Sequence, residues 1–211
     1  MKQNFILSSI LLSSLLFNTG CMEKIQPIIP TSIPSESIVE EVNETTSNSP
    51  TVENTTPIPP PTPYKTRQMK TVQGGMITIR ENNISFDFPE YRGKIVLVQI
   101  FGKECKYCFE ELPTVNKIQE AYRDKLSVIA IQGQPPMTQE KAFELIRQHD
   151  MNYPIIDQDE AKSILLFLRD IYDWRGILPY ILLVKDGQIE QVFQGADKSF
   201  EEISEGINEI H

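Results

Sequence analysis

The 211-residue chain is poor in the side chains that bind metal ions. It has two histidines and three cysteines, and no second CxxC or His-x-His pair accompanies Cys105 and Cys108. A zinc site usually needs four ligands, so a metal centre here would have to recruit His149, His211 or carboxylates. The composition therefore disfavours a metal site, and no other cofactor is indicated.

Positive charge is also scarce. The chain has 20 Lys and Arg against 29 Asp and Glu, a net charge of −9, and no run of basic residues. Contact with phosphates needs a basic face, and an acidic surface would repel them. We therefore expect no nucleic-acid partner.

No hydrophobic run is long enough to cross a membrane, which takes roughly 20 apolar residues. Lys2 precedes only thirteen residues, 5–17, rich in Leu, Ile and Ser. This pattern indicates an export signal over residues 1–20. The following "NTGC" resembles the lipobox of bacterial lipoproteins, with Asn18 where that motif usually has Leu. It implies lipidation of Cys21, the alternative being a signal peptide cut further on. A lipidated Cys21 would leave no odd thiol beside the CxxC pair.

Residues 21–66 are rich in Pro, Ser, Thr, Glu and Asn, with few large apolar side chains. Such a segment cannot bury enough surface to offset its ordering entropy, so we expect a disordered tether. Asn43 within it, and Asn83 beyond it, lie in segments that resemble the extended acceptor of bacterial N-glycosylation. A chain so rich in Asn and Thr also produces such segments by chance.

The pattern becomes regular over residues 67–211. Alternating or continuous apolar runs predict a hairpin over 76–79 and 83–88, buried strands over 94–101 and 126–132, and a hairpin over 180–184 and 188–194. Three- and four-residue spacing predicts a helix after the cysteines, a helix after a Thr138 N-cap, another over 159–174, and a C-terminal helix. The order predicts an α/β fold with helices on both faces of the sheet.

Cys105 and Cys108 lie where an apolar strand ends and a helix begins. A structural disulfide over two intervening residues would constrain the unfolded chain little. At a helix N-terminus, by contrast, unpaired N–H groups and the helix dipole favour a thiolate, the form that attacks disulfides. We therefore interpret the pair as a redox centre.

The segment "GKIVLVQIFGKECKYCFEELP" resembles the active-site segment of the thioredoxin fold, especially its exported, tethered TlpA-like branch. Phe101 and Pro113 match that pattern beside the two cysteines. "WRGILPYILLVKDGQI" is similar to the segment that holds the family's cis-proline. The resemblance covers residues 74–211 and implies a central mixed sheet, a strand-and-helix insertion over 135–175, and Pro179 opposite the cysteines, with Leu178 before it.

The chain departs from that family at two positions. Glu104 stands where Trp usually precedes the first cysteine, and Gln99 stands where a buried Asp or Asn is frequent, so no carboxylate base is expected there. The charge of Glu104 opposes a thiolate, whereas Lys103 and Lys106 favour it. We expect Lys106 and Tyr107 either to tune the redox potential or simply to face solvent.

Three further interpretations concern residues near the pair. Tyr172 and Trp174 either line a groove beside the cysteines or pack in the core. Glu110 and Glu111 are expected to stabilise the first helical turn and to take no part in catalysis. Pro179 is expected to keep a backbone edge free for an extended substrate segment.

The predicted chemistry is thiol-disulfide exchange, in which Cys105 attacks and Cys108 resolves. The resemblance implies a lipoprotein of the bacterial cell envelope, facing the periplasm or the exterior. It would reduce cysteine pairs of exported proteins, such as apocytochromes, with electrons from a membrane donor. The alternatives are an oxidase or isomerase that exchanges with a membrane acceptor, and a copper chaperone on the same fold.

Overall fold

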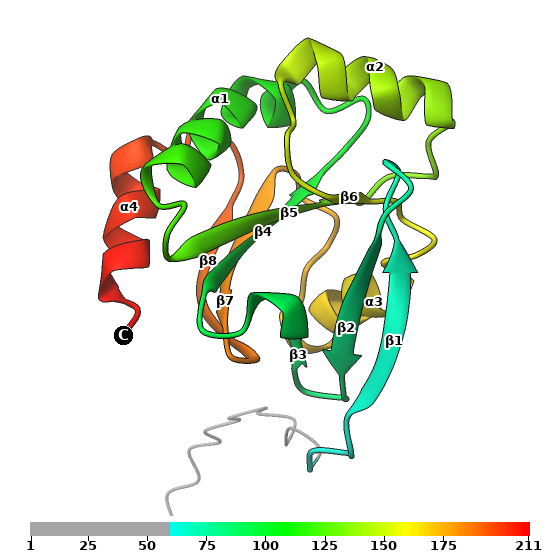
Figure 1. Cartoon of the computed structure of the whole chain (residues 1–211), viewed down its shortest axis with the longest axis vertical. Helices are drawn as coiled ribbons and strands as arrows, with labels where there is room; N and C mark the ends of the chain where they lie inside the picture. The colour runs from blue at the N-terminus through cyan, green and yellow to red at the C-terminus, as the bar shows by residue number, and fades with distance from the viewer. Residues whose placement is uncertain (1–59) are drawn as a thin grey trace, which may run out of the picture. The chain divides into compact units, whose positions relative to one another are not determined.

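The computed structural model describes residues 60–211 (Figure 1). The predicted signal peptide, Cys21, Asn43 and most of the predicted tether lie outside these residues. Within 60–211, no helix has the length and apolar character needed to span a bilayer.

A five-stranded mixed sheet forms the centre, in the order β6-β5-β4-β7-β8. Its strands are β4 (Ile95–Phe101), β5 (Leu126–Gln132), β6 (Ile155–Ile156), β7 (Tyr180–Lys185) and β8 (Gln188–Gln194). β4 runs parallel to β5 and antiparallel to β7. All seven β4 residues are buried, as expected for a central strand covered on both faces. The predicted mixed sheet is confirmed.

Helices cover both faces of this sheet, as predicted (Figure 1). The helices α1 (Lys106–Ala121), α2 (Gln139–His149) and α4 (Phe200–Glu209) pack on one face, and α3 (Lys162–Ile171) packs on the other. Thr138 caps α2 by accepting a hydrogen bond from the Lys141 amide, as predicted. The expected strand-and-helix insertion contains two helices, α2 and α3, around the two-residue β6.

A second, smaller sheet lies beside α3. It consists of β1 (Lys65–Lys70), β2 (Met76–Glu81) and β3 (Phe86–Asp87), all antiparallel. The predicted N-terminal hairpin corresponds to β2 and β3. β1 was not predicted, because its sequence KTRQMK is polar and buries only Met69. Pairing with β2 along its whole length makes it a strand, beginning two residues before the expected domain boundary.

The segment that enters the domain is fastened at the turn between β2 and β3. The Thr62 amide donates to Asn83 Oδ1 (2.6 Å), and Asn83 Nδ2 donates to the Pro60 carbonyl (2.9 Å). Tyr64 donates to Ser85 Oγ, which in turn donates to the carbonyl of Gly187 in the β7–β8 turn. Residues 60–64 therefore lie close to the β2–β3 and β7–β8 turns. Both the oxygen and the nitrogen of the Asn83 side-chain amide already take part in hydrogen bonds.

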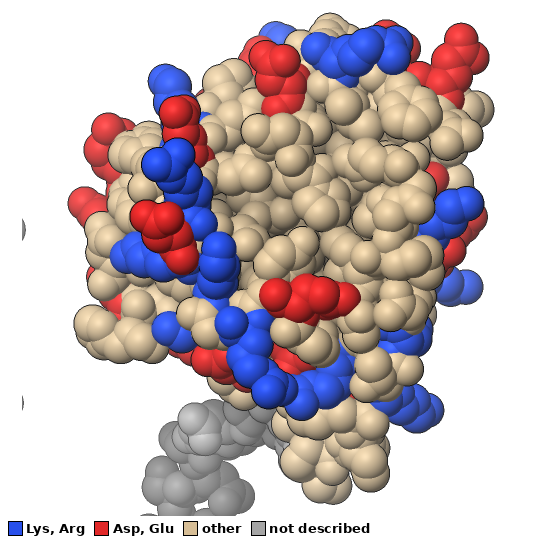
Figure 2. Space-filling view, viewed as in Figure 1, with Lys and Arg blue, Asp and Glu red and all other residues tan. Residues whose placement is uncertain are grey.

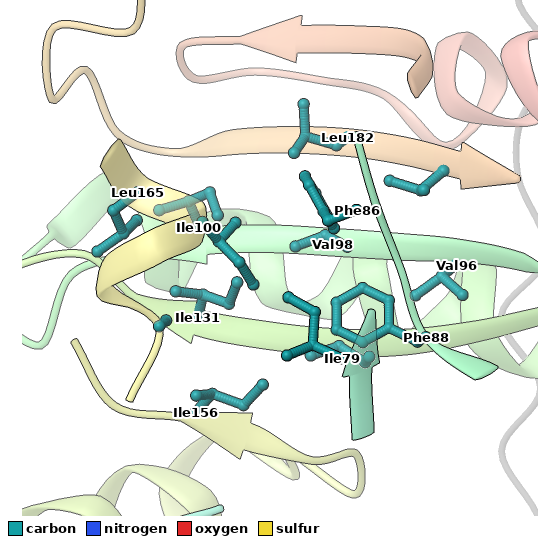
Figure 3. Close-up of a cluster of buried hydrophobic side chains, with 14 of the residues drawn as sticks. Ile79, Phe86, Phe88, Val96, Val98, Ile100, Ile131, Ile156, Leu165 and Leu182 are labelled. Atoms are coloured by element: carbon teal, nitrogen blue, oxygen red, sulfur yellow. The ribbon is translucent and has the colours of Figure 1, made fainter. Parts of the chain in front are cut away.

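Two hydrophobic cores lie on the two faces of the five-stranded sheet. We call the one beneath α3, β1, β2 and β3 the α3-side core, and Figure 3 shows side chains of this core, among them Phe86, Phe88, Ile79, Val98 and Ile131. The other, the α1-side core, lies beneath α1, α2 and α4. Alternation along β4 sends Val96, Val98 and Ile100 to the first core and Ile95, Leu97 and Phe101 to the second.

Candidate active site

Cys105 and Cys108 lie in the connection from β4 to α1 and form a disulfide. Cys105 is the N-cap of α1, with extended backbone angles, and its Sγ accepts a hydrogen bond from the Cys108 amide (3.2 Å). This amide is one of the donors that a helix leaves unpaired at its N-terminus. In the reduced protein it would stabilise a thiolate at Cys105, together with the helix dipole.

The two sulfur-bearing residues differ in access. Cys105 is partly exposed, whereas Cys108 has 0% exposure and packs in the α1-side core. A partner protein can therefore approach Cys105 but not Cys108. This asymmetry suits an attacking cysteine followed by an internal resolving cysteine.

The Leu178–Pro179 peptide bond is cis, as the resemblance implies. The register of β7 on β4 pairs Tyr180 with Ile100, so Pro179 lies next to the end of β4, just ahead of the cysteines. The Pro179 carbonyl accepts a hydrogen bond from the Gly195 amide (3.0 Å). No backbone hydrogen bond within residues 60–211 engages the N–H or carbonyl of Leu178.

A carboxyl group is buried on α1, about one helical turn after Cys108. Glu111 follows Cys108 by three residues on α1, and both belong to the buried stripe of that helix. Glu111 Oε2 accepts a hydrogen bond from Gln99 Nε2 on β4 (3.3 Å). Burial raises the pKa of Glu111 to about 7, although the hydrogen bond from Gln99 and the charge of Lys198 oppose this rise. α1 has no acidic residue in its first turn, so the expected placement of Glu110 and Glu111 there is wrong, and Glu111 is buried further along the helix.

Unpaired polar atoms surround this carboxyl. Glu111 Oε1, Gln99 Oε1 and the Tyr153 hydroxyl are buried and have no hydrogen-bond partner among the described residues. Burial, and then the charge of Glu111, raises the pKa of Tyr153. A polar cluster therefore lies inside the α1-side core, next to the buried cysteine.

Sequence and structure comparisons agree with this geometry. No family model matches the chain. Thiol-disulfide oxidoreductase ResA of Bacillus thuringiensis subsp. konkukian is 24% identical over 128 residues, which cover 59% of this chain and 68% of that protein. A secreted Mycobacterium tuberculosis disulfide oxidoreductase homologous to E. coli DsbE matches in structure with a TM-score of 0.50 and 15% identity, over 68% of this chain and 96% of that one. The thioredoxin domain of a Bacteroides vulgatus thiol-disulfide oxidoreductase matches with a TM-score of 0.52 and 19% identity, over 68% and 94%.

The chain is a thioredoxin-fold thiol-disulfide oxidoreductase. Its predicted fold is confirmed, and the CxxC pair has the place that this chemistry requires. Gln99 occupies the strand position at which no carboxylate base was expected. The structure nevertheless brings a carboxyl to that place, because Glu111 reaches it from the facing helix.

The residues predicted to tune the redox potential lie on the exposed surface around Cys105. Glu104 is exposed, and its amide donates to Gln134 Oε1 (3.0 Å). Lys106 Nζ lies 3.4 Å from Glu110 Oε1 and sits over the Tyr107 ring. Tyr107 is 56% exposed. These side chains can therefore meet both solvent and a docked substrate.

Trp174 is partly buried against the α3-side core and donates through Nε1 to the Ile177 carbonyl (2.9 Å). It also lines a cavity of about 530 Å³ with Gly133, Leu165 and Leu166 among others. Trp174 therefore packs against the core, one of the two arrangements that the sequence left open, and the lining of this cavity includes neither Cys105 nor Cys108. Tyr172 is 37% exposed and contacts Phe167 at a centroid distance of 5.6 Å.

His149, the first nitrogen ligand considered for a metal, packs on α1. Its ring stacks on Phe109, with centroids 4.7 Å apart. Burial lowers the pKa of His149, and the charge of Lys141 lowers it further. Across residues 60–211, no three His, Cys, Asp or Glu side chains gather as a metal site would need.

Proposed function

We propose that this oxidoreductase is a membrane-tethered reductase of exported proteins, acting on cysteine pairs such as those of apocytochromes before haem attachment. The observation that carries the proposal is the bonded pair of one accessible and one buried cysteine at the start of α1. The names of its relatives support the setting. ResA is a thiol-disulfide oxidoreductase, and the Mycobacterium tuberculosis relative is secreted.

The reaction takes two exchange steps. In the reduced protein, the Cys105 thiolate attacks one sulfur of a substrate disulfide, forming a mixed disulfide and releasing the other substrate sulfur as a thiolate, which takes up a proton. The Cys108 thiolate then attacks Cys105 Sγ and releases the second substrate thiol. The substrate gains two electrons, and the protein ends with the Cys105–Cys108 disulfide. A membrane donor of two electrons restores the dithiol.

Glu111 is suited to accept the proton of Cys108. A buried thiol resists ionisation, so the second step needs a base near Cys108. The Glu111 carboxyl lies on the same helical stripe and has a pKa of about 7, so it is partly ionised at neutral pH. Gln99 holds it there by a hydrogen bond.

Leu178 supplies the docking edge for the substrate. Its N–H and carbonyl, unbonded within the described chain, lie beside the cysteines and can pair with an extended substrate segment as an added strand. Glu104, Lys106 and Tyr107 surround Cys105 and would set its potential through charge and contact. Lipidated Cys21 would hold the protein at the membrane, facing the periplasm or the exterior.

The test is a covalent trap with a matched variant. Cys108→Ala should accumulate a mixed disulfide through Cys105 in the native host, whereas Cys105→Ser should capture nothing and lose insulin reduction. Cytochrome precursors in the trap would support the reductase. Many unrelated secreted proteins would indicate an oxidase or isomerase, and stoichiometric copper binding by the reduced protein without exchange would indicate a chaperone.

A further inference from the structure

A group of basic side chains gathers at the edge of the domain opposite the cysteines. The group, which we call the basic edge, comes from three segments that are far apart in the sequence: the residues before β4, those before β5, and the end of β7. Its members are Arg92, Lys94, Arg123, Lys125 and Lys185. Figure 2 shows Lys and Arg running as a band across the lower left of the molecule.

Hydrogen bonds and strand register hold the three segments together. Lys94 Nζ donates to the Arg123 carbonyl (3.1 Å), and the Ile95 amide donates to the Lys125 carbonyl (2.9 Å). Lys185 is the register partner of Ile95. The basic side chains therefore belong to one continuous surface, although no run of basic residues appears in the sequence.

The cations of this edge are largely uncompensated. None of the five takes part in an ion pair within residues 60–211. Arg92, Arg123 and Lys125 are exposed, and Lys94 and Lys185 are partly exposed. Asp124 and Asp186 lie among them in the sequence, which leaves an excess of positive charge in a chain of net charge −9.

The edge also lies where the chain enters the domain. Tyr64 reaches Gly187 through Ser85, and Gly187 is two residues from Lys185. β4 has seven residues, so the basic edge and the cysteines lie roughly 20 Å apart, at about 3.3 Å per residue. A tether leaving from Pro60 therefore starts beside the basic edge and far from the active site.

We infer that the basic edge binds the anionic headgroups of the membrane that holds the tether. This inference rests on the tether of the proposed function. Contact at this edge turns the opposite edge of the sheet, with Cys105, away from the lipid surface. A basic side chain near an anionic bilayer increases affinity roughly fivefold. The domain would therefore stay oriented toward its substrates.

The other occupant that charge would allow is the chain's own acidic segment, with glutamates at positions 36, 40, 41, 44 and 53. Fixing each residue of such a segment costs about 1–2 kcal/mol in backbone entropy. An exposed ion pair returns only about 0–1 kcal/mol. A bilayer surface presents its charges without that cost, so the membrane is favoured.

The experiment places the purified lipidated protein on vesicles of neutral phosphatidylcholine or of phosphatidylcholine with phosphatidylglycerol. An amine reagent and mass spectrometry then measure the labelling rate of each lysine. We expect Lys94, Lys125 and Lys185 to be labelled at least about fivefold more slowly on the anionic vesicles. The difference should vanish in high salt, while Lys162 on α3 should react equally on both.

Two variants of equal net charge sharpen the test. Arg92→Gln with Arg123→Gln should reduce the protection of the lysines, whereas Arg147→Gln with Lys162→Gln should leave it intact. Equal labelling on both vesicles overturns the inference. The lysines could instead be protected on both vesicles, and the protection could disappear when the five glutamates are replaced by Gln. That result would assign the basic edge to the chain's own acidic segment, and it would also overturn the inference.

A failure of this inference can be distinguished from a failure of the proposed function. A protein that fails to bind neutral vesicles lacks the lipid anchor, whatever its labelling on anionic ones. A protein that fails to reduce insulin lacks the proposed activity, whatever its orientation. Both basic-edge substitutions lie far from the cysteines, so insulin reduction in solution should be unchanged.

Discussion

The α3-side core and the α1-side core share one sheet but differ in what they bury. Polar groups beside the α3-side core are bonded, such as Asp87 with Arg80 and Ser85 with Gly187. On the α1 side, by contrast, lie all six buried polar side-chain atoms that lack a partner in the described chain: those of Gln99, Glu111, Asn116, His149, Tyr153 and Ser204. An unsatisfied buried group costs stability.

The two sides of the sheet thus serve different purposes. The α3-side core supplies stability through apolar packing, including edge-to-face contacts of Phe86 with Phe88 and Phe167. The α1-side core gives up part of its stability to keep a carboxyl group close to Cys108.

Phe86→Ala should lower the free energy of unfolding by about 3–5 kcal/mol, because it leaves a cavity among fully buried side chains. Insulin reduction per folded molecule should stay unchanged. Denaturant unfolding and activity of the same samples measure both. Leu112→Ala, on the α1 side next to Glu111, should cost about 2–5 kcal/mol and also slow reduction. Equal effects of the two variants on reduction would remove the functional distinction between the cores.

Glu111→Gln should change how stability depends on pH. Because the folded pKa of Glu111 lies near 7, above the usual 4.5, the folded protein binds more protons between these values. The contribution of this proton binding to the free energy of unfolding is complete below this window and is lost as the pH rises through it. The variant should match the wild type at pH 4 and exceed it by about 3 kcal/mol at pH 8.5.

Denaturant unfolding of the disulfide-bonded protein across this pH range checks the prediction. Parallel curves for the two proteins would show that Glu111 is not perturbed. In the reduced protein, the same variant should slow the resolving step and remove its pH dependence near 7. Glu110→Gln, on the exposed side of α1, is the matched control and should change neither quantity.

Gln99→Leu should raise the titration midpoint of Glu111 by roughly one unit, since it removes a hydrogen bond that favours the carboxylate. Carbon-detected NMR of the glutamate side chains measures the midpoint directly. Gln132→Leu removes another fully buried glutamine, one that donates to the Pro135 carbonyl, and should leave Glu111 unmoved. A downward shift in Gln99→Leu would contradict the assigned role of Gln99.

Tyr153→Phe should have the smallest effect, a change between zero and a gain of about 1 kcal/mol, because the lost hydroxyl has no partner in the described chain. Tyr180→Phe, in the α3-side core, provides the comparison. Thermal and denaturant unfolding at pH 6 measure both variants. A loss above about 1 kcal/mol in Tyr153→Phe would show that its hydroxyl is bonded after all.

Periodicity predicted most of the fold. β4 and β5 are continuous apolar runs, and α4 repeats apolar side chains at helical spacing, so local sequence and tertiary environment agree there. β1 escaped prediction because its sequence is polar and only its pairing with β2 makes it a strand. The left-handed pair Asp186 and Gly187 was recognisable, since the β7–β8 turn needs positive φ at both residues.

The site was predicted in part. The CxxC spacing identified Cys105 and Cys108, and the resemblance placed Pro179. Glu111 was missed, although its spacing of three from Cys108 and four from Val115 puts it on the buried stripe of α1. A charged residue on an apolar stripe was the available signal. The basic edge left no such signal, because only the folded chain brings its segments together.

The fastening of Pro60 and Thr62 by Asn83 has a mechanical consequence. A mechanical force applied to the preceding chain acts first on these hydrogen bonds. It then acts as a shear force between β1 and β2. The strand that ends at the cysteines lies in a different sheet. The redox pair is therefore shielded from strain that enters through the leading segment.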